Sequence, residues 1–185
     1  AADHLGLNPS VPATCFPTAG TVANSWDPAL AEEMGEALGD EAHDLDVNVL
    51  LGPGLNIKRN PLCGRNFEYY SEDPIVAGRM AAGLIRGIQS NGISACPKHF
   101  AVNSQELRRQ ASNSVVDERT MRELYLTGFE IAVREAKPLT IMTSYNLINA
   151  LHTANSHDLI QAAARDEWGF EGVVMTDWFT SQDMP

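Results

Sequence analysis

The feature that most constrains the fold is an alternation of short apolar runs with longer helical patterns. Apolar runs occur at Val47–Leu51, Ile93–Cys96, Leu139–Thr143 and Val173–Thr176. Each is rich in aliphatic side chains and is followed by glycine, proline or polar residues. Strands that are buried on both faces of a parallel sheet have this pattern. A weaker strand candidate lies at residues 14–22.

Helical patterns fill the gaps between these runs. The first two begin at Asp27 and Asp73, and a proline follows each aspartate, which suits the first turn of a helix. The third begins at Asp117, and the fourth extends from near Ser156 to Gly169. Their apolar residues recur every three or four positions, which places them on one side of a helix. The order strand, helix, strand, helix predicts an α/β fold.

Two architectures satisfy this order: an open doubly wound sheet and a closed (β/α)8 barrel of the TIM type. Periodicity does not separate them. In both, polar groups collect at the carboxyl ends of the strands, where α/β proteins build their sites. Here the segments after the four runs are rich in such groups: "GPGLNIKRNPLCGRNFEYYSEDP", "PKHFAVNSQELRRQ", "SYN" and "DWFTSQD".

Length, charge and cysteine content set further limits. A chain of 185 residues can form one domain with a substantial core, so residues 1–185 are expected to form a single domain. A formal net charge of −11 argues against nucleic acid and an anionic membrane as partners. The cysteines, Cys15, Cys63 and Cys96, are odd in number and widely spaced, which argues against a disulfide framework. A reducing compartment is therefore expected, with the cytoplasm favoured.

Asp177, in "GVVMTDW", has two interpretations. It caps the following segment through backbone N–H groups, or it is a carboxylate aimed at a substrate. Lys98 and His99 follow another apolar run, which favours a site. Because neighbouring side chains of an extended segment point to opposite faces, these two meet one ligand only if the backbone bends there.

Other polar residues near the strand ends have simpler explanations as well. Arg65, in a long loop, has Glu68 and Glu72 as candidate partners for a surface ion pair, and Tyr145 is alternatively a core aromatic. A solvated run of charges is the alternative for Glu106, Arg108 and Arg109.

Several chemistries fail on spacing. The remaining histidines form no metal-binding pattern, and no metal or organic cofactor is expected. Phosphate-binding, dinucleotide-binding and GxSxG patterns are absent from the sequence. What remains is a carboxylate with cations, a tyrosine and asparagines. Such a set suits a neutral polyol, a sugar whose hydroxyls bind the polar groups while a carboxylate attacks carbon.

The sequence resembles glycoside hydrolase family 3, the β-glucosidase and β-xylosidase family, over nearly all of its length. The matching stretches are "GPGLNIKRNPLCGRNFEYYSEDP", "ACPKHFAVNSQE", "NSVVDERTMRELYLTGFEIAV", "IMTSYN" and "EWGFEGVVMTDW". The resemblance implies a (β/α)8 barrel and a retaining, exo-acting β-glycosidase that takes an oligosaccharide or glycoside. It also implies that Asp177 is the nucleophile with Tyr145 beside it, and that Arg65, Lys98 and His99 bind the sugar.

Two departures from the family pattern lead to further expectations. The upstream "DGPxGxR"-like stretch is absent, and the sequence ends at Pro185, before the last part of the family's barrel and its second domain. A barrel usually needs about 250 residues. We therefore expect an incomplete barrel and a missing C-terminal domain. An incomplete barrel leaves strand edges unpaired, so self-association is expected. The Gly/His-rich loop that follows "KHF" in β-N-acetylhexosaminidases is also absent, which favours a glucosidase- or xylosidase-like parent.

Retaining hydrolysis needs a second carboxyl about 5–5.5 Å from the nucleophile. Candidates within the chain are Glu68, Glu72, Glu106 and Asp183, whereas the resemblance points to a glutamate in the missing domain. Two rival functions stay open. One is a catalytically inactive sugar-binding fragment, and the other is a Schiff-base lyase with Lys98 as its nucleophile.

Overall fold

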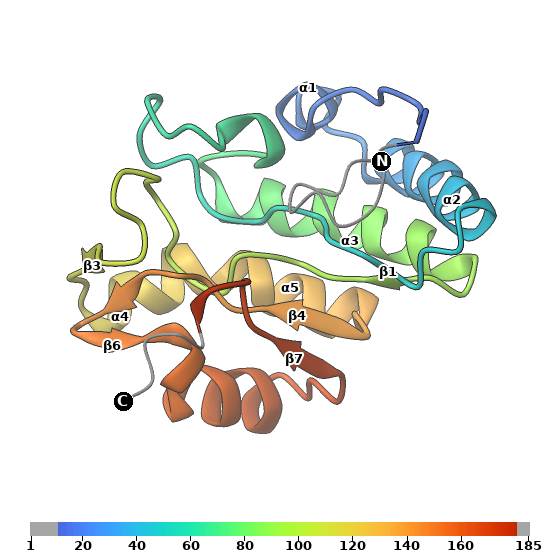
Figure 1. The fold of residues 1–185 in the computed structure, drawn as a ribbon. Coiled ribbons are helices and arrows are strands. Elements are labelled where there is room, and N and C mark those ends of the chain that lie inside the picture. The colour runs from blue at the N-terminus through green and yellow to red at the C-terminus, as the bar shows by residue number, and fades with distance from the viewer. Residues whose placement is uncertain (1–10, 181–185) are drawn as a thin grey trace.

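The computed structural model describes residues 11–180. Parallel strands lie side by side in chain order (Figure 1): β1 (Val49–Leu50), β2 (Ser94–Ala95), β4 (Thr140–Met142) and β7 (Val173–Met175). β1 pairs with β2, and β4 pairs with β7. A bridge between Phe100 and Thr143 joins the two pairs just beyond β2 and β4. The predicted apolar runs are thus confirmed as strands, although fewer of their residues pair than the runs contain.

The predicted helices are also confirmed. α2 (Pro28–Asp44) and α3 (Pro74–Ser90) each begin after an aspartate whose carboxylate accepts hydrogen bonds from two backbone N–H groups. These caps satisfy donors that the first turn of a helix would otherwise leave unpaired. The proline at the first position of each helix needs no such partner.

The third and fourth helices are less regular. α4 (Glu118–Thr120) is capped by Asp117 and leads through the π-helical segment η2 (Met121–Leu126) into α5 (Thr127–Ala136). η4 (Asp158–Glu167) is π-helical, and the Ser156 hydroxyl accepts a hydrogen bond from the N–H of Leu159 in its first turn.

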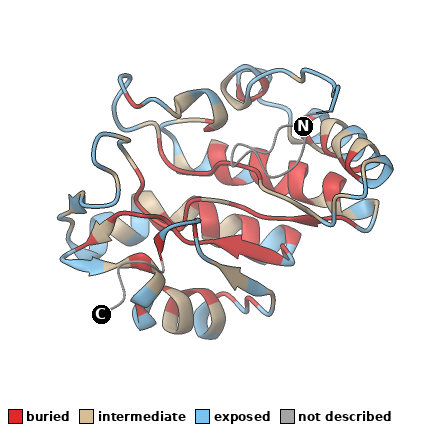
Figure 2. Cartoon of the chain, in the orientation of Figure 1, coloured by how far each residue is buried: buried red, intermediate tan, exposed pale blue. Residues whose placement is uncertain are grey.

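The core lies between the strands and the helices behind them. α3 packs against α2 on one side and α5 on the other, and it is the most deeply buried helix (Figures 1 and 2). α2 and α3 touch through their backbones, because a Cβ at Gly87 would meet the carbonyl oxygen of Glu32. Phe100 packs edge-on against Phe129 and Trp168, with ring centroids 5.1 and 5.8 Å apart, and so ties the end of β2 to α5 and to η4's end.

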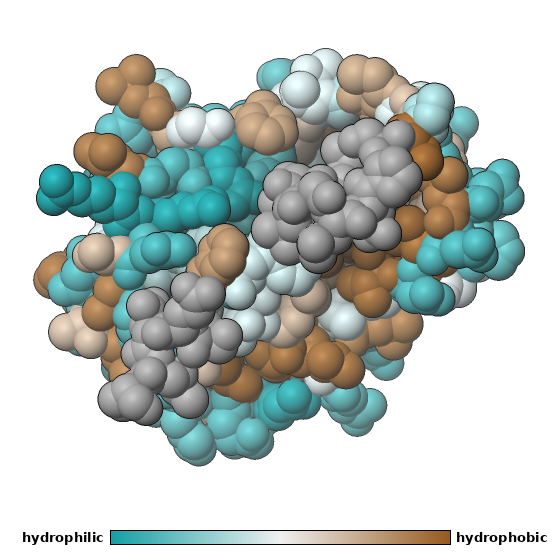
Figure 3. Space-filling model, in the orientation of Figure 1, coloured by the Kyte–Doolittle hydropathy of each residue, from teal (hydrophilic) through white to brown (hydrophobic). Residues whose placement is uncertain are grey.

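The described residues form a mixed α/β arrangement with no closed barrel. Within residues 11–180, the parallel set begins at β1 and ends at β7, and no pairing joins these two strands. A mainly apolar hollow of about 490 Å³ lies between β1 and α2. Figure 3 shows apolar surface on the side of the molecule where α2 and β1 lie.

Several elements were not predicted. A small sheet contains β3 (Asn113–Ser114), β5 (Leu147–Ile148) and β6 (Leu151–His152), and single turns occur at η1 (Asn66–Glu68) and η3 (Thr153–Asn155). The strand expected at residues 14–22 is wrong. That region contains the start of helix α1 (Ala19–Ala23), because the Thr18 side chain accepts a hydrogen bond from the N–H of Thr21 and begins a turn.

No helix within residues 11–180 is both long enough and apolar enough to cross a membrane. Cys15, Cys63 and Cys96 are all unpaired.

Candidate functional site

Asp177 follows β7 at its carboxyl end and is only 6% exposed. Its Oδ1 accepts a hydrogen bond of 3.0 Å from the N–H of Trp178. Its Oδ2 faces the Nε2 of His99 at 3.9 Å, which is beyond hydrogen-bonding distance. The capping interpretation thus accounts for one carboxylate oxygen, and the other is directed at the end of β2.

Lys98 and His99 follow β2, and the peptide bond between them is cis. Both side chains join the cluster around Asp177. The Lys98 ammonium lies 3.1 Å from Glu68 Oε2, and His99 is 1% exposed. The Asn56 side chain pins the His99 backbone: its Oδ1 accepts from the His99 N–H at 2.7 Å, and its Nδ2 donates to the His99 carbonyl at 2.8 Å. The loop after β1 therefore fixes the position of His99.

Arg65 lies just before η1 and donates to Glu68 through its Nε atom. Glu68 was one of its expected partners, but the pair does not lie on the open surface. The two side chains are 20% and 18% exposed, and Glu68 contacts Lys98 as well. One carboxylate thus holds two cations at the edge of the cluster.

Tyr145 is 3% exposed, and its hydroxyl accepts a hydrogen bond of 3.1 Å from the N–H of Phe179. Its ring is covered by the Arg109 guanidinium, whose central carbon lies 4.6 Å from the ring centroid. Burial raises the pKa of Tyr145, and the neighbouring Asp177 carboxylate acts in the same direction. The structure therefore brings Tyr145 beside Asp177.

Arg109 is a site residue that the sequence did not single out. Its guanidinium donates to Glu106 Oε2 at 2.8 Å and stacks on Tyr145, so the interpretation of Glu106 and Arg109 as a solvated charge run is wrong. Arg108 is exposed, as that interpretation expected. The sequence held no signal that separates the two arginines, because they are adjacent and the segment has no regular periodicity.

The surroundings lower the pKa of His99 and raise the pKa of Asp177. Burial lowers the pKa of His99 well below its usual value, and the cations Arg65, Lys98 and Arg109 add to this effect. Burial raises the pKa of Asp177, whereas the Trp178 N–H and the same three cations oppose that rise. A carboxylate that is desolvated yet surrounded by donors has the environment of a reactive group.

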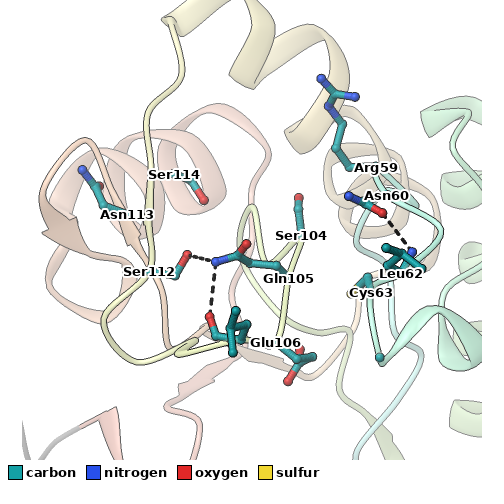
Figure 4. A pocket seen from close by; sticks show the side chains of 12 residues that line it. Arg59, Asn60, Leu62, Cys63, Ser104, Gln105, Glu106, Ser112, Asn113 and Ser114 are labelled. Carbon is teal, nitrogen blue, oxygen red and sulfur yellow. Dashed lines mark hydrogen bonds between the residues drawn. The ribbon is translucent and has the colours of Figure 1, made fainter.

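A hollow of about 530 Å³, lined by both polar and apolar groups, lies beside this cluster, between the loop after β1 and the loop after β2 (Figure 4). Glu106 lines it, whereas Asp177 does not. Gln105 and Ser112 close one side through a hydrogen bond of 2.8 Å. Glu106 therefore stands between the hollow and the polar cluster.

Among residues 11–180, no three His, Cys, Asp or Glu side chains gather as a metal-binding group would require.

In parallel α/β folds, ligands bind at the edge where the carboxyl ends of the strands meet, and in this chain that edge carries a buried carboxylate and cations. The chain belongs to glycosyl hydrolase family 3, since the model of that family's N-terminal domain matches residues 5–184.

Known proteins resemble the chain closely. It is 49% identical over 182 residues to the thermostable beta-glucosidase B of Acetivibrio thermocellus. This match covers 98% of this chain and 24% of that protein. It is 50% identical over 182 residues to an exo-alpha-(1->6)-L-arabinopyranosidase of Bifidobacterium breve, with the same coverage of 98% and 24%.

Solved structures agree with these sequence matches. The GH3 beta-glucosidase of Bifidobacterium adolescentis superposes with a TM-score of 0.91 at 50% identity, over 95% of this chain and 26% of that one. Beta-glucosidase 3B of Thermotoga neapolitana, in complex with glucose, gives a TM-score of 0.89 at 49% identity, over 90% of this chain and 23% of that one. The chain thus spans about a quarter of the length of these relatives.

Proposed function

We propose that the protein is a retaining, exo-acting β-glycosidase in which Asp177 attacks the anomeric carbon. The observation that carries this proposal is the setting of Asp177. Asp177 is 6% exposed, and its Oδ1 accepts a hydrogen bond from the Trp178 N–H. Its Oδ2 accepts no backbone hydrogen bond from residues 11–180, and three nearby cations oppose the rise of its pKa. In a retaining enzyme such a carboxylate forms a glycosyl-enzyme intermediate, which water then hydrolyses.

The surrounding polar groups suit a sugar in the subsite where cleavage occurs. Lys98 and His99 present nitrogen atoms from the end of β2, and Arg65 does so from the loop after β1. Arg109 and Tyr145 bound the other side of Asp177. Hydrogen bonds from charged donors to buried sugar hydroxyls are worth about 1.5–3 kcal/mol each.

The second carboxyl is proposed to come from outside the described residues. Glu68 is engaged by Arg65 and Lys98, and Glu106 by Arg109, so neither is free to carry a proton to a leaving group. Glu72 is exposed and lines a different hollow, near Trp26. Asp183 lies outside the described residues. The acid/base would therefore belong to the rest of a longer protein, since the relatives are about four times as long as this chain.

The lyase alternative is weakened by the surroundings of Lys98. A Schiff-base lysine attacks through a free nitrogen lone pair, whereas the Lys98 nitrogen lies 3.1 Å from the Glu68 carboxylate in an ion pair. Treatment with borohydride and a carbonyl ligand tests this directly. Covalent modification of Lys98 would support the lyase and contradict the glycosidase.

The alternative of sugar binding without turnover remains open, because within residues 11–180 Glu68 and Glu106 are held in ion pairs and Glu72 lines a different hollow. The test compares this 185-residue chain with a version extended at both ends to the length of its relatives. General acid catalysis contributes about 10²- to 10⁴-fold, so the short chain should turn over a disaccharide far more slowly. Equal turnover by the two would contradict the proposed origin of the acid/base.

The extended version also tests the reaction itself. Aryl β-glucoside and aryl α-L-arabinopyranoside are compared, because relatives with both activities match at about 50% identity. Proton NMR of the first product should give the anomer of the substrate, and Asp177→Asn should abolish turnover. Asp158→Asn, at an exposed aspartate, is the control and should leave turnover unchanged. Inversion of the anomeric centre would refute the retaining mechanism.

A further inference from the structure

A hydrogen-bonded set of polar side chains lies on the Nδ1 side of His99, away from Asp177. Tyr69 is fully buried, and its hydroxyl lies 3.1 Å from His99 Nδ1. The Asn103 side-chain nitrogen lies 3.2 Å from that hydroxyl and 3.0 Å from Glu106 Oε1. The other Glu106 oxygen accepts from Arg109 at 2.8 Å. These contacts link Arg109 to His99 through three intermediate side chains.

The direction of each hydrogen bond follows from the charged end. Arginine only donates and an ionised glutamate only accepts, so Glu106 must receive a hydrogen from Asn103 as well as from Arg109. Asn103 therefore turns its NH₂ group toward Glu106. In the flipped orientation, the Asn103 carbonyl oxygen would face the carboxylate. Its NH₂ group would then occupy the place of Oδ1, which has no hydrogen-bond partner within residues 11–180.

The same reasoning fixes the proton of Tyr69. The two Asn103 hydrogens go to Glu106 and to the Tyr69 oxygen, so this oxygen acts as an acceptor. Its own hydrogen then needs an acceptor, and His99 Nδ1 is the one that the described residues supply. Burial raises the pKa of Tyr69 far above its ordinary value, which keeps the hydroxyl protonated.

We propose that Tyr69, Asn103 and Glu106 are positioning residues that hold His99 as the neutral tautomer with its hydrogen on Nε2. That hydrogen points to the side of Asp177, where Nε2 and Oδ2 are 3.9 Å apart. His99 then donates to a ligand oxygen and does not accept from it. Only the identity of that ligand, a sugar hydroxyl beside the nucleophile, rests on the proposed function.

The tautomer can be measured without any turnover. The 185-residue chain is labelled with ¹⁵N-histidine, and long-range proton–nitrogen correlations distinguish a protonated ring nitrogen from a bare one. His99→Gln identifies the His99 signals by their loss. We expect a protonated Nε2 and a bare Nδ1 at neutral pH. A protonated Nδ1, or protons on both nitrogens, would overturn the proposal.

Two substitutions test the cause of the tautomer. Tyr69→Phe removes the donor to Nδ1 and should convert a single His99 tautomer into a mixture. Tyr70→Phe removes the hydroxyl from the adjacent buried tyrosine and should leave the His99 signals in place. Glu106→Gln removes the charge that orients Asn103 and should also give a mixture, whereas Glu106→Asp should retain part of the single form. If His99 keeps a single tautomer in both Tyr69→Phe and Glu106→Gln, the role of this set is refuted.

A glucose titration separates this inference from the proposed function. A single Nε2–H tautomer with no response of His99 to glucose would support the positioning set and count against the sugar site. A response to glucose from a His99 that is protonated on Nδ1 would support the sugar site and refute the positioning set. If Tyr69→Phe does not fold, the tautomer of the unsubstituted chain and the effect of Glu106→Gln decide the matter.

Discussion

Asn56 offers the sharpest test of how the fold holds the site, because one buried side chain satisfies both backbone groups of His99. Asn56 is 2% exposed and its two bonds to the His99 N–H and carbonyl measure 2.7 and 2.8 Å. Asn56→Ala removes both partners. The bonds join residues 43 apart in sequence, so no local element can replace them.

The expected magnitude follows from the two groups left behind. A buried backbone group without a partner costs about 1–3 kcal/mol, so two of them cost about 2–6 kcal/mol. Water that enters the vacated space satisfies part of this loss, which favours the lower half of the range, about 2–4 kcal/mol. A loss of this size is a large fraction of the stability of a typical domain.

Urea unfolding followed by circular dichroism measures the effect. The control is Asn60→Ala, at an exposed asparagine of the same loop whose side chain accepts from the N–H of Leu62 at 2.9 Å. That substitution should cost below about 1 kcal/mol. If Asn56→Ala lowers the free energy of unfolding by no more than Asn60→Ala does, the claim that Asn56 fixes His99 is refuted.

Three further predictions concern packing, pH and association. Gly87→Ala should lower the free energy of unfolding, measured in urea, by about 1–3 kcal/mol, because the new Cβ would meet the backbone of α2. Gly128→Ala is the control and should not destabilise the fold, because a Cβ there makes only ordinary contacts. The lowered pKa of His99 means that the unfolded chain binds its proton first, so stability should fall as the pH drops below about 6.5. In His99→Gln this loss of stability at low pH should be absent when urea midpoints are compared between pH 7.5 and 5.5. An unchanged pH dependence in His99→Gln would contradict the assignment of the loss to His99. Finally, Val173 in β7 is 63% exposed, so the chain should self-associate through such edges, and Val173→Lys should reduce the mass seen in analytical ultracentrifugation.

The elements that the sequence predicted are those set by local patterns. The caps at Asp27 and Asp73 and the prolines that follow them act within one turn, so the starts of α2 and α3 could be read directly. The strand expected at residues 14–22 was wrong because its β-branched residues include Thr18, which caps a helix instead. The small sheet of β3, β5 and β6 was missed, since strands of two residues have no alternation to detect.

The residues of the candidate site also divide into those that the sequence indicated and those that it did not. Asp177, Lys98 and His99 lie at strand ends, which is a position that sequence order reveals. Asn56 and Tyr69 act on His99 from 43 and 30 residues away, and no periodicity records such a contact. The roles of the site residues stay predictions, because the family match identifies the chain and not what each side chain does.

The central claim is that the Asp177 carboxylate is the group that bonds to the sugar. The most direct measurement incubates the extended version with an activated 2-fluoro glycoside, digests it, and locates the label by mass spectrometry. We expect one added sugar on the peptide that contains Asp177, and no label in Asp177→Ala. A label on Glu68, Glu106 or Lys98, or an undiminished label in Asp177→Ala, would contradict it.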